Sequence, residues 1–114
     1  MRPSSDITGY HAHVYFDAET VGKARALCEA ASDALKVEMG RVHERNVGPH
    51  PRWSCQLAFQ AQELGEVLPW LVLNRAGLTV FIHAETGDDL KDHTEHDIWL
   101  GEMLPLDLSI FDRH

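Results

Sequence analysis

The sequence has few cysteines, few basic residues and no long apolar run. Its two cysteines, Cys28 and Cys55, form no CxxC pair, so we interpret both as buried thiols in a reducing compartment. Ten Lys and Arg against eighteen Asp and Glu give a net charge of −8, which argues against nucleic acid or anionic lipid as a partner. No apolar run approaches the roughly 18 residues of a membrane-spanning helix, and residues 1–6 lack the apolar core of a signal peptide. We therefore expect a cytoplasmic protein without membrane association.

The remaining composition is that of one ordinary globular domain spanning residues 1–114. An apolar fraction of 44% and a charged fraction of 25% are typical of such domains, and the length suffices for a two-layer core without disulfide bonds. Histidine is the residue type in excess, with eight in the chain. Because imidazole binds transition metals and transfers protons near neutral pH, these histidines direct the search for a functional site.

Apolar periodicity predicts four strands and two helices in the order βαββαβ. Strands are expected at residues 8–16, around Val42, at 53–59 and at 78–84, and helices at 18–37 and 62–74. Asp17 is the candidate N-cap of the first helix, Gly40 marks its end, and Pro69 falls inside the second helix. With right-handed crossovers this order closes into a ferredoxin-like α+β fold. Its four-stranded antiparallel sheet has the order 4-1-3-2, with both helices on one face.

The pattern changes from Glu85 onward, where a C-terminal extension begins. A polar turn comes first, residues 92–97 are rich in His and Asp, and residues 98–108 are again apolar. An extension of mixed polarity needs a surface to pack on. We expect it to cover the open face of the sheet or to contact a partner subunit.

Strand geometry places several histidines on one face of the sheet. Side chains alternate along a strand, so His11, His13 and Tyr15 share one face, while the apolar residues between them face the helices. On the fourth strand the same alternation places His83 and Glu85 on the open face. The first and fourth strands are antiparallel neighbours in this fold, and directly opposed Cβ atoms lie roughly 5 Å apart. The histidines of the two strands therefore form a candidate metal site.

His11, His13 and His83 are the predicted metal ligands, and whether Glu85 is a further ligand stays open. Imidazoles and a carboxylate with open coordination positions are typical of non-haem Fe(II) oxygenases, so Fe(II) is the expected metal. Zn²⁺ also suits histidine ligation and is the alternative. The competing interpretation is a set of polar side chains on a solvated or interface face.

Three further histidines lie where the chain can hold them in place. His50 lies between two prolines in a stiff loop, with a surface turn as the alternative interpretation. His93 and His96 are three residues apart, and Asp92 and Asp97 beside them are candidate hydrogen-bond acceptors. The alternative for this pair is a solvated acidic segment.

Short motifs of aromatic, histidine and turn residues extend from about residue 9 to residue 108. They are HAHVYF at 11–16, GPHP at 48–51, WLVLNR at 70–75, IH at 82–83, TGD at 86–88, DHT at 92–94, WLG at 99–101 and LDL at 106–108. Together and in this order they resemble the DOPA 4,5-dioxygenase family. The resemblance implies a ferredoxin-like fold and extradiol cleavage of the DOPA ring with O₂. The seco-DOPA products of this reaction cyclise to betalain-type pigments.

Ring cleavage of this kind explains the residue types. A metal with three protein ligands keeps positions open for the two oxygens of a catechol and for O₂. His50 and His93 are the predicted catalytic residues, because an imidazole that titrates near neutrality suits proton transfer. The predicted substrate-binding residues are Arg52, Trp53 and Arg75, with Lys91 as a further candidate for holding a substrate carboxylate.

The competing interpretation keeps the fold and rejects the oxygenase. It is a non-catalytic zinc-binding or ligand-binding dimeric α/β module. Metal content and O₂ uptake with a catechol separate the two hypotheses. In both cases we expect a homodimer, because an open face carrying Tyr15, Phe81 and an apolar tail would otherwise be exposed.

Overall fold

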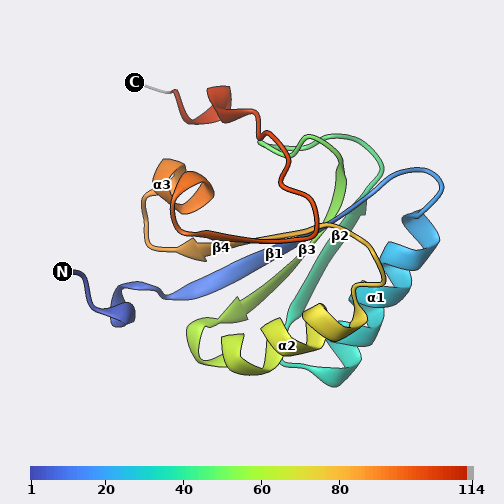
Figure 1. Cartoon of the computed structure of the whole chain (residues 1–114), viewed down its shortest axis with the longest axis horizontal. Coiled ribbons are helices and arrows are strands. Elements are labelled where there is room, and N and C mark those ends of the chain that lie inside the picture. The colour runs from blue at the N-terminus through green and yellow to red at the C-terminus, as the bar shows by residue number, and fades with distance from the viewer. Residues whose placement is uncertain (113–114) are drawn as a thin grey trace.

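The computed structural model describes residues 1–112, and its elements follow the predicted βαββαβ order (Figure 1). They are β1 (Gly9–Phe16), α1 (Val21–Ala34), β2 (Glu38–His43), β3 (Trp53–Gln60), α2 (Leu64–Asn74), β4 (Val80–Glu85), α3 (Asp89–Thr94) and β5 (Asp97–Leu100). Short 3-10 turns occupy Ser4–Asp6, Ala61–Glu63 and Leu108–Phe111. Among the described residues, no helix combines the length and the apolar character needed to span a bilayer.

The sheet is antiparallel throughout and has the strand order β2-β3-β1-β4-β5. The predicted ferredoxin-like α+β fold and the order of its first four strands are confirmed. The prediction of four strands is wrong in one respect, because β5 adds a fifth strand beside β4 and pairs Leu100 with Val80. A segment of four residues is too short for alternation to distinguish a strand from an apolar loop.

One face of the sheet packs against α1 and α2 and forms the main core. The inward residues of β1 are Ala12, Val14 and Phe16, which alternate with the histidines as predicted. The other buried members are Ala24, Leu27, Cys28, Ala31, Cys55, Leu57, Phe59, Val67, Leu71, Leu78, Val80 and Ile82. Because burial of apolar surface dominates the stability of such a core, these residues determine which face of β1 meets the helices. The histidines of β1 point to the opposite face.

The first helix is shorter than its periodicity predicts. Asp17 accepts hydrogen bonds from the backbone N–H groups of Glu19 and Thr20, both at 3.0 Å, and so closes a turn ahead of the helix. Short polar side chains that bond to nearby backbone compete with helix formation, which delays the start of α1 to Val21. At the other end the backbone becomes extended at Leu35, and the predicted terminator Gly40 lies inside β2.

The C-terminal extension covers the face of the sheet that α1 and α2 leave open. Figure 1 shows α3 and the last turn on the side of the sheet opposite those two helices. The Trp99 ring centroid lies 4.5 Å from that of Phe81, and the N–H of Asp107 donates to the carbonyl of Pro49 at 2.8 Å. Of the two predicted alternatives, packing within the chain is confirmed. Phe81 and Tyr15 are consequently almost fully buried without a partner subunit.

Two leucine substitutions test which face carries the core. Leu57 is 0% exposed, so Leu57→Ala leaves a cavity in the core and is expected to lower the free energy of unfolding by about 2–5 kcal/mol. The matched control, Leu73→Ala on the outer side of α2, changes an 83% exposed residue and should stay within about 0.5 kcal/mol. Urea denaturation followed by circular dichroism measures both. Equal effects of the two substitutions would contradict this packing.

Candidate metal centre

The ladder between β1 and β4 brings three histidines together. His11 is directly opposite His83, and His13 lies two residues further along on the same face. One ligand atom from each of the three can be chosen so that all lie within 4.8 Å of one another. His13 and His83 are buried, whereas His11 is partly exposed. This cluster can hold a metal ion, and it contains the three residues predicted from strand alternation.

Two of these imidazoles are spaced so that both could bind the same metal ion. The Nε2 atoms of His13 and His83 lie 3.0 Å apart. If two nitrogens each lie about 2.1 Å from one metal and the N–metal–N angle is 90°, the nitrogens are roughly 3.0 Å apart. Right angles between neighbouring ligands are those of an octahedral ion, the geometry that leaves further positions for substrate. The two nitrogens, which lie within hydrogen-bond distance of each other, are therefore also close enough to bind one metal ion.

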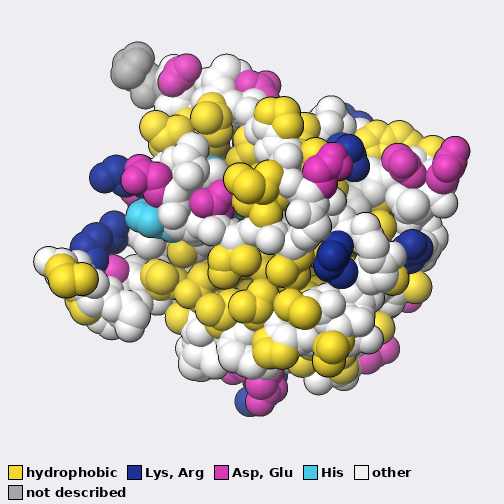
Figure 2. Space-filling model, viewed as in Figure 1, with side chains coloured by type: hydrophobic (Ala, Val, Ile, Leu, Met, Phe, Trp, Pro, Cys, Tyr) yellow, Lys and Arg dark blue, Asp and Glu magenta, His cyan; other side chains and the backbone are white. Residues whose placement is uncertain are grey.

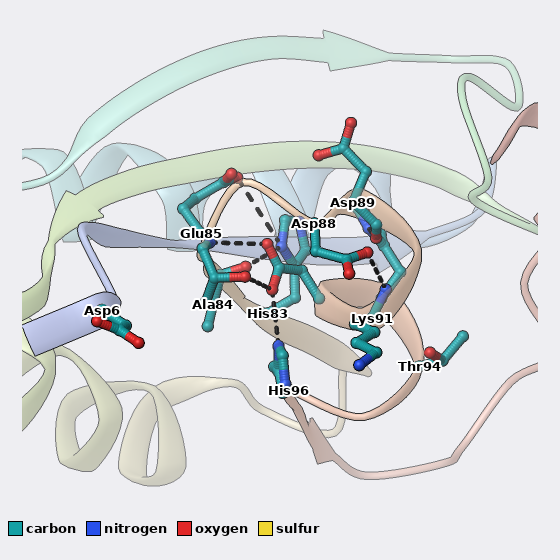
Figure 3. A network of polar contacts seen from close by, with 12 residues as sticks. Asp6, His83, Ala84, Glu85, Asp88, Asp89, Lys91, Thr94 and His96 are labelled. Carbon is teal, nitrogen blue, oxygen red and sulfur yellow. Dashed lines mark hydrogen bonds and ion pairs between the residues drawn. The ribbon is translucent and has the colours of Figure 1, made fainter. Parts of the chain in front are cut away.

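The outer nitrogens of two imidazoles are held by hydrogen bonds (Figure 3). His83 Nδ1 donates to the carbonyl oxygen of Ala84 at 3.1 Å, and His11 Nδ1 donates to Glu85 Oε1 at 2.8 Å. An oxygen of either kind only accepts, so the proton of each neutral ring is on Nδ1 and the lone pair is on Nε2. Histidine ligands of metals are commonly oriented in this way by a carboxylate or a backbone carbonyl. Glu85 thus contacts the cluster as a partner of His11.

Two further histidines flank the three. The ring of His50 lies 4.0 Å from that of His13, and the ring of His93 lies 4.0 Å from that of His83, measured between centroids. His50 comes from the loop before β3 and His93 from α3, so neither belongs to the β1–β4 ladder. The structure brings together all five histidines that the sequence singled out as ligands or catalytic residues. Their individual roles stay predictions.

The His96 ring bonds to a buried carboxylate, and Figure 3 shows this ring in the same polar network as His83 and Glu85. Asp92 is 1% exposed and accepts hydrogen bonds from the Thr86 N–H at 2.8 Å and the Thr86 hydroxyl at 2.6 Å. His96 Nδ1 donates to the same carboxylate at 2.8 Å, as predicted from its position beside Asp92. Asp97 instead accepts from the indole N–H of Trp99. The Asp92 network joins the start of the extension to α3 and thereby holds His93 over the sheet.

Burial keeps the clustered imidazoles neutral. Desolvation, together with the smaller effect of the neighbouring histidines, lowers the pKa of His83 to about 3 and that of His50 to about 4. Burial likewise places the pKa of His13 well below its ordinary value and lowers the pKa of His11. A neutral imidazole has a free lone pair, which is the form that binds a metal. The site is therefore ready for ligation at neutral pH.

The predicted substrate-binding residues lie apart from the cluster. Arg52 is 3.7 Å from Glu102 in an exposed ion pair, and Arg75 donates to the carbonyl of Leu78 at 2.9 Å. The Trp53 ring packs edge-on against Phe16, 6.2 Å between centroids. Within residues 1–112, none of the three contacts the five histidines. Their part in substrate binding stays a prediction.

The sequence reasoning missed two features next to the histidines. The hydroxyl of Tyr15 lies 2.7 Å from His50 Nδ1. A cavity of about 750 Å³ has His11 and Glu85 in its wall, together with Glu38 and Gln60. This volume lies within the range of small-molecule sites. Alternation placed Tyr15 on the correct face, but only the position of the loop before β3 reveals its partner.

The lowered histidine pKa values predict a pH-dependent stability of the metal-free protein. An unfolded histidine titrates near 6.5, above the folded-state pKa of His50 at about 4 and of His83 at about 3. Between those values the unfolded chain binds more protons, so the free energy of unfolding should rise with pH from 4 to 6.5 and then level off. Urea denaturation of EDTA-treated protein measures it. The His50→Gln variant should show a shallower rise, and an identical slope would contradict the assignment.

Comparisons with known proteins agree with this geometry. A proposed dioxygenase from Nostoc punctiforme, known from its crystal structure, superposes with a TM-score of 0.95 at 39% identity, covering 97% of this chain and 96% of that one. An uncharacterized 21.2 kDa protein of Botryotinia fuckeliana is 34% identical over 99% of this chain. The DOPA 4,5-dioxygenase of Amanita muscaria is 28% identical over 92% of it.

The relatives from the two fungi are longer proteins. The chain spans 66% of the Botryotinia fuckeliana protein and 50% of the Amanita muscaria enzyme. The family model of the Dopa 4,5-dioxygenases matches residues 10–110, which include β1, the loop of His50, β4 and α3. The resemblance seen in the short motifs is thus confirmed over nearly the whole chain. This protein belongs to the Dopa 4,5-dioxygenase family.

Proposed function

We propose that this protein is an extradiol dioxygenase that opens the ring of a catechol such as L-DOPA with O₂. The proposed metal is Fe(II), held by His11, His13 and His83. The observation that supports it most directly is the convergence of these three imidazoles, of which His11 also lines a cavity, in a chain of the Dopa 4,5-dioxygenase family. Three protein ligands are the number that leaves room for a bidentate catechol and for O₂.

A bound Fe(II) ion would supply the redox chemistry, because it brings the catechol and O₂ together and lets electrons pass from one to the other. The chain's own groups orient and protect the reactants. His11 and Glu85 lie in the cavity wall, so a catechol bound there would reach the cluster at its His11 edge. Phe81 and Trp99 pack beside the cluster and exclude water from its inner side.

His50 and His93 are the proposed proton-transfer groups. Each ring lies 4.0 Å from a proposed ligand, so both are within reach of a substrate bound beside His13 and His83. A catechol loses a proton when it binds and a proton returns during ring opening, and His50 and His93 flank the cluster on which both steps are proposed to occur. For the substrate's outer end, Arg52, Trp53 and Arg75 remain candidates, and the cavity adds Glu38 and Gln60 as alternatives.

Fe(II) reconstitution under anaerobic conditions is the main test of the proposed function. The reconstituted protein is expected to bind one equivalent of metal, to consume O₂ when a catechol is added, and to form a yellow ring-opened product. The Zn²⁺ form should bind metal with no O₂ uptake, because zinc has no redox chemistry. Tight metal binding without O₂ uptake in the Fe(II) form would instead support the non-catalytic zinc-binding module.

Histidine variants test the assignment of the ligands. Loss of a residue that hydrogen-bonds to a metal ligand typically weakens metal affinity roughly 10–100-fold. His13→Ala and His83→Ala each remove a proposed ligand, so each is expected to weaken metal affinity by more than this and to abolish O₂ uptake. His43→Ala is the matched control, because His43 lies at the end of β2 and should retain metal and activity. Elemental analysis and an oxygen electrode measure the two quantities. Full metal content in both cluster variants would place the site elsewhere.

A cytoplasmic location is part of this proposal, because Cys28 and Cys55 are free thiols.

A homodimer is also part of this proposal. Figure 2 shows hydrophobic side chains gathered between the sheet and α2 on this face of the molecule. Val72 and Leu73 of α2 and Ile98 of β5 are exposed. Apolar patches of this kind usually mark contact surfaces. We expect a dimer mass by light scattering at micromolar concentration, and a monomer mass would contradict it.

A further inference from the structure

Tyr15 and His50 form a buried hydrogen bond that the assignments above leave without a role. Tyr15 projects from β1 on the face of His11 and His13 and is 1% exposed. Its hydroxyl oxygen lies 2.7 Å from Nδ1 of His50, which is 7% exposed. A tyrosine hydroxyl buried in this way must direct its proton at an acceptor, since an unsatisfied donor costs roughly 1–3 kcal/mol.

The direction of this bond follows from what each atom can do. Within residues 1–112, His50 Nδ1 is the hydrogen-bond partner of the Tyr15 hydroxyl, and no other acceptor is available for its proton. A phenol ordinarily titrates near 10, so the hydroxyl keeps that proton at neutral pH. The hydroxyl therefore donates and Nδ1 accepts. A neutral ring that accepts at Nδ1 carries its own proton on Nε2.

His93, on the opposite flank of the cluster, has the reverse arrangement. Its Nδ1 lies 2.7 Å from the carbonyl oxygen of Asp89. A carbonyl only accepts, so Nδ1 donates and the lone pair of the neutral ring is on Nε2. Neither Nε2 atom of the two flanking histidines has a hydrogen-bond partner within the described residues 1–112. One of these atoms can therefore act as a donor and the other as an acceptor without breaking a bond within the protein.

We infer that Tyr15 is a positioning residue that fixes His50 in the Nε2–H form, which makes His50 the proton donor of the site and leaves His93 as the proton acceptor. This inference deepens the proposed function and rests on it. A catechol hydroxyl gives its proton to His93 Nε2 on binding. His50 Nε2 gives its proton to an oxygen derived from O₂ during ring opening. The catechol supplies the electrons that reduce O₂, and both oxygen atoms enter the product.

The two proton transfers balance over one turnover. Adding O₂ to a catechol to give a ring-opened product changes no proton count, so the proton taken up by His93 replaces the one that His50 gives away. Exchange with solvent returns both rings to their starting forms. The Tyr15 hydroxyl provides the asymmetry, because without it His50 has no fixed tautomer.

Long-range ¹H–¹⁵N correlation spectra of the histidine rings test the inference without any turnover. They are recorded on the full chain without metal and again with diamagnetic Zn²⁺. In the unaltered protein we expect His50 to show a bare Nδ1 and a protonated Nε2. In Tyr15→Phe we expect both tautomers of His50 to be populated. Tyr10→Phe removes the only other tyrosine hydroxyl and should leave the His50 tautomer unchanged.

Steady-state kinetics of the Fe(II) form supply the second readout. Tyr15→Phe is expected to lower kcat by about 10–100-fold at unchanged metal content, with little change in KM for the catechol, since proton transfer contributes roughly 10²–10⁴-fold to such reactions. A purely structural bond would change stability and leave the tautomer in place. Protonation of His50 at Nδ1 in the unaltered protein overturns the inference whatever the activity. If the tautomer is as expected but no O₂ is consumed, the dioxygenase proposal fails, and with it the donor role of His50.

Discussion

The antiparallel ladder between β1 and β4 places His11 directly opposite His83 and His13 one step along the same face. Every other feature of the candidate site depends on this pairing. The ladder is held in register by its opposite face, where Ala12, Val14 and Ile82 are buried under the helices. A shift of one residue would exchange the two faces and bury the histidines in the main core. The apolar core thus determines the position of polar groups that it does not touch.

The C-terminal extension converts this polar face into a site. Without it, His13 and His83 would lie on an open sheet with imidazole pKa values near those in water. With α3, β5 and the Asp107–Pro49 contact in place, the face is desolvated, and the pKa of His83 falls to about 3. Burying neutral polar rings costs free energy unless they are hydrogen-bonded. The bonds to Ala84, Glu85 and Tyr15 meet part of that cost and orient the rings at the same time.

The two faces of the sheet are covered by layers with different roles. The layer with α1 and α2 contains most of the apolar core and provides stability, while the layer with α3 and the tail supplies His93 and holds the loop of His50. Within the second layer, the Asp92 carboxylate fixes the turn after β4 and orients α3. This arrangement agrees with the extent of the family match, which includes the extension as far as residue 110. The extension forms one wall of the site.

Local periodicity in the sequence determined the strands, the helices and the face on which His11, His13 and His83 meet, because alternation in a strand is a property of neighbouring residues. It also identified His50 and His93 as candidates, from a stiff loop and from the acidic segment around them. Only the tertiary structure decided that these two rings flank the cluster, that β5 extends the sheet and that Tyr15 bonds to His50. Each of these depends on contacts between segments far apart in the chain, such as Asp107 with Pro49, and no local pattern encodes such a contact. The same reason applies to Arg52 and Arg75, because their charge is visible in the sequence but their contacts with Glu102 and Leu78 are not.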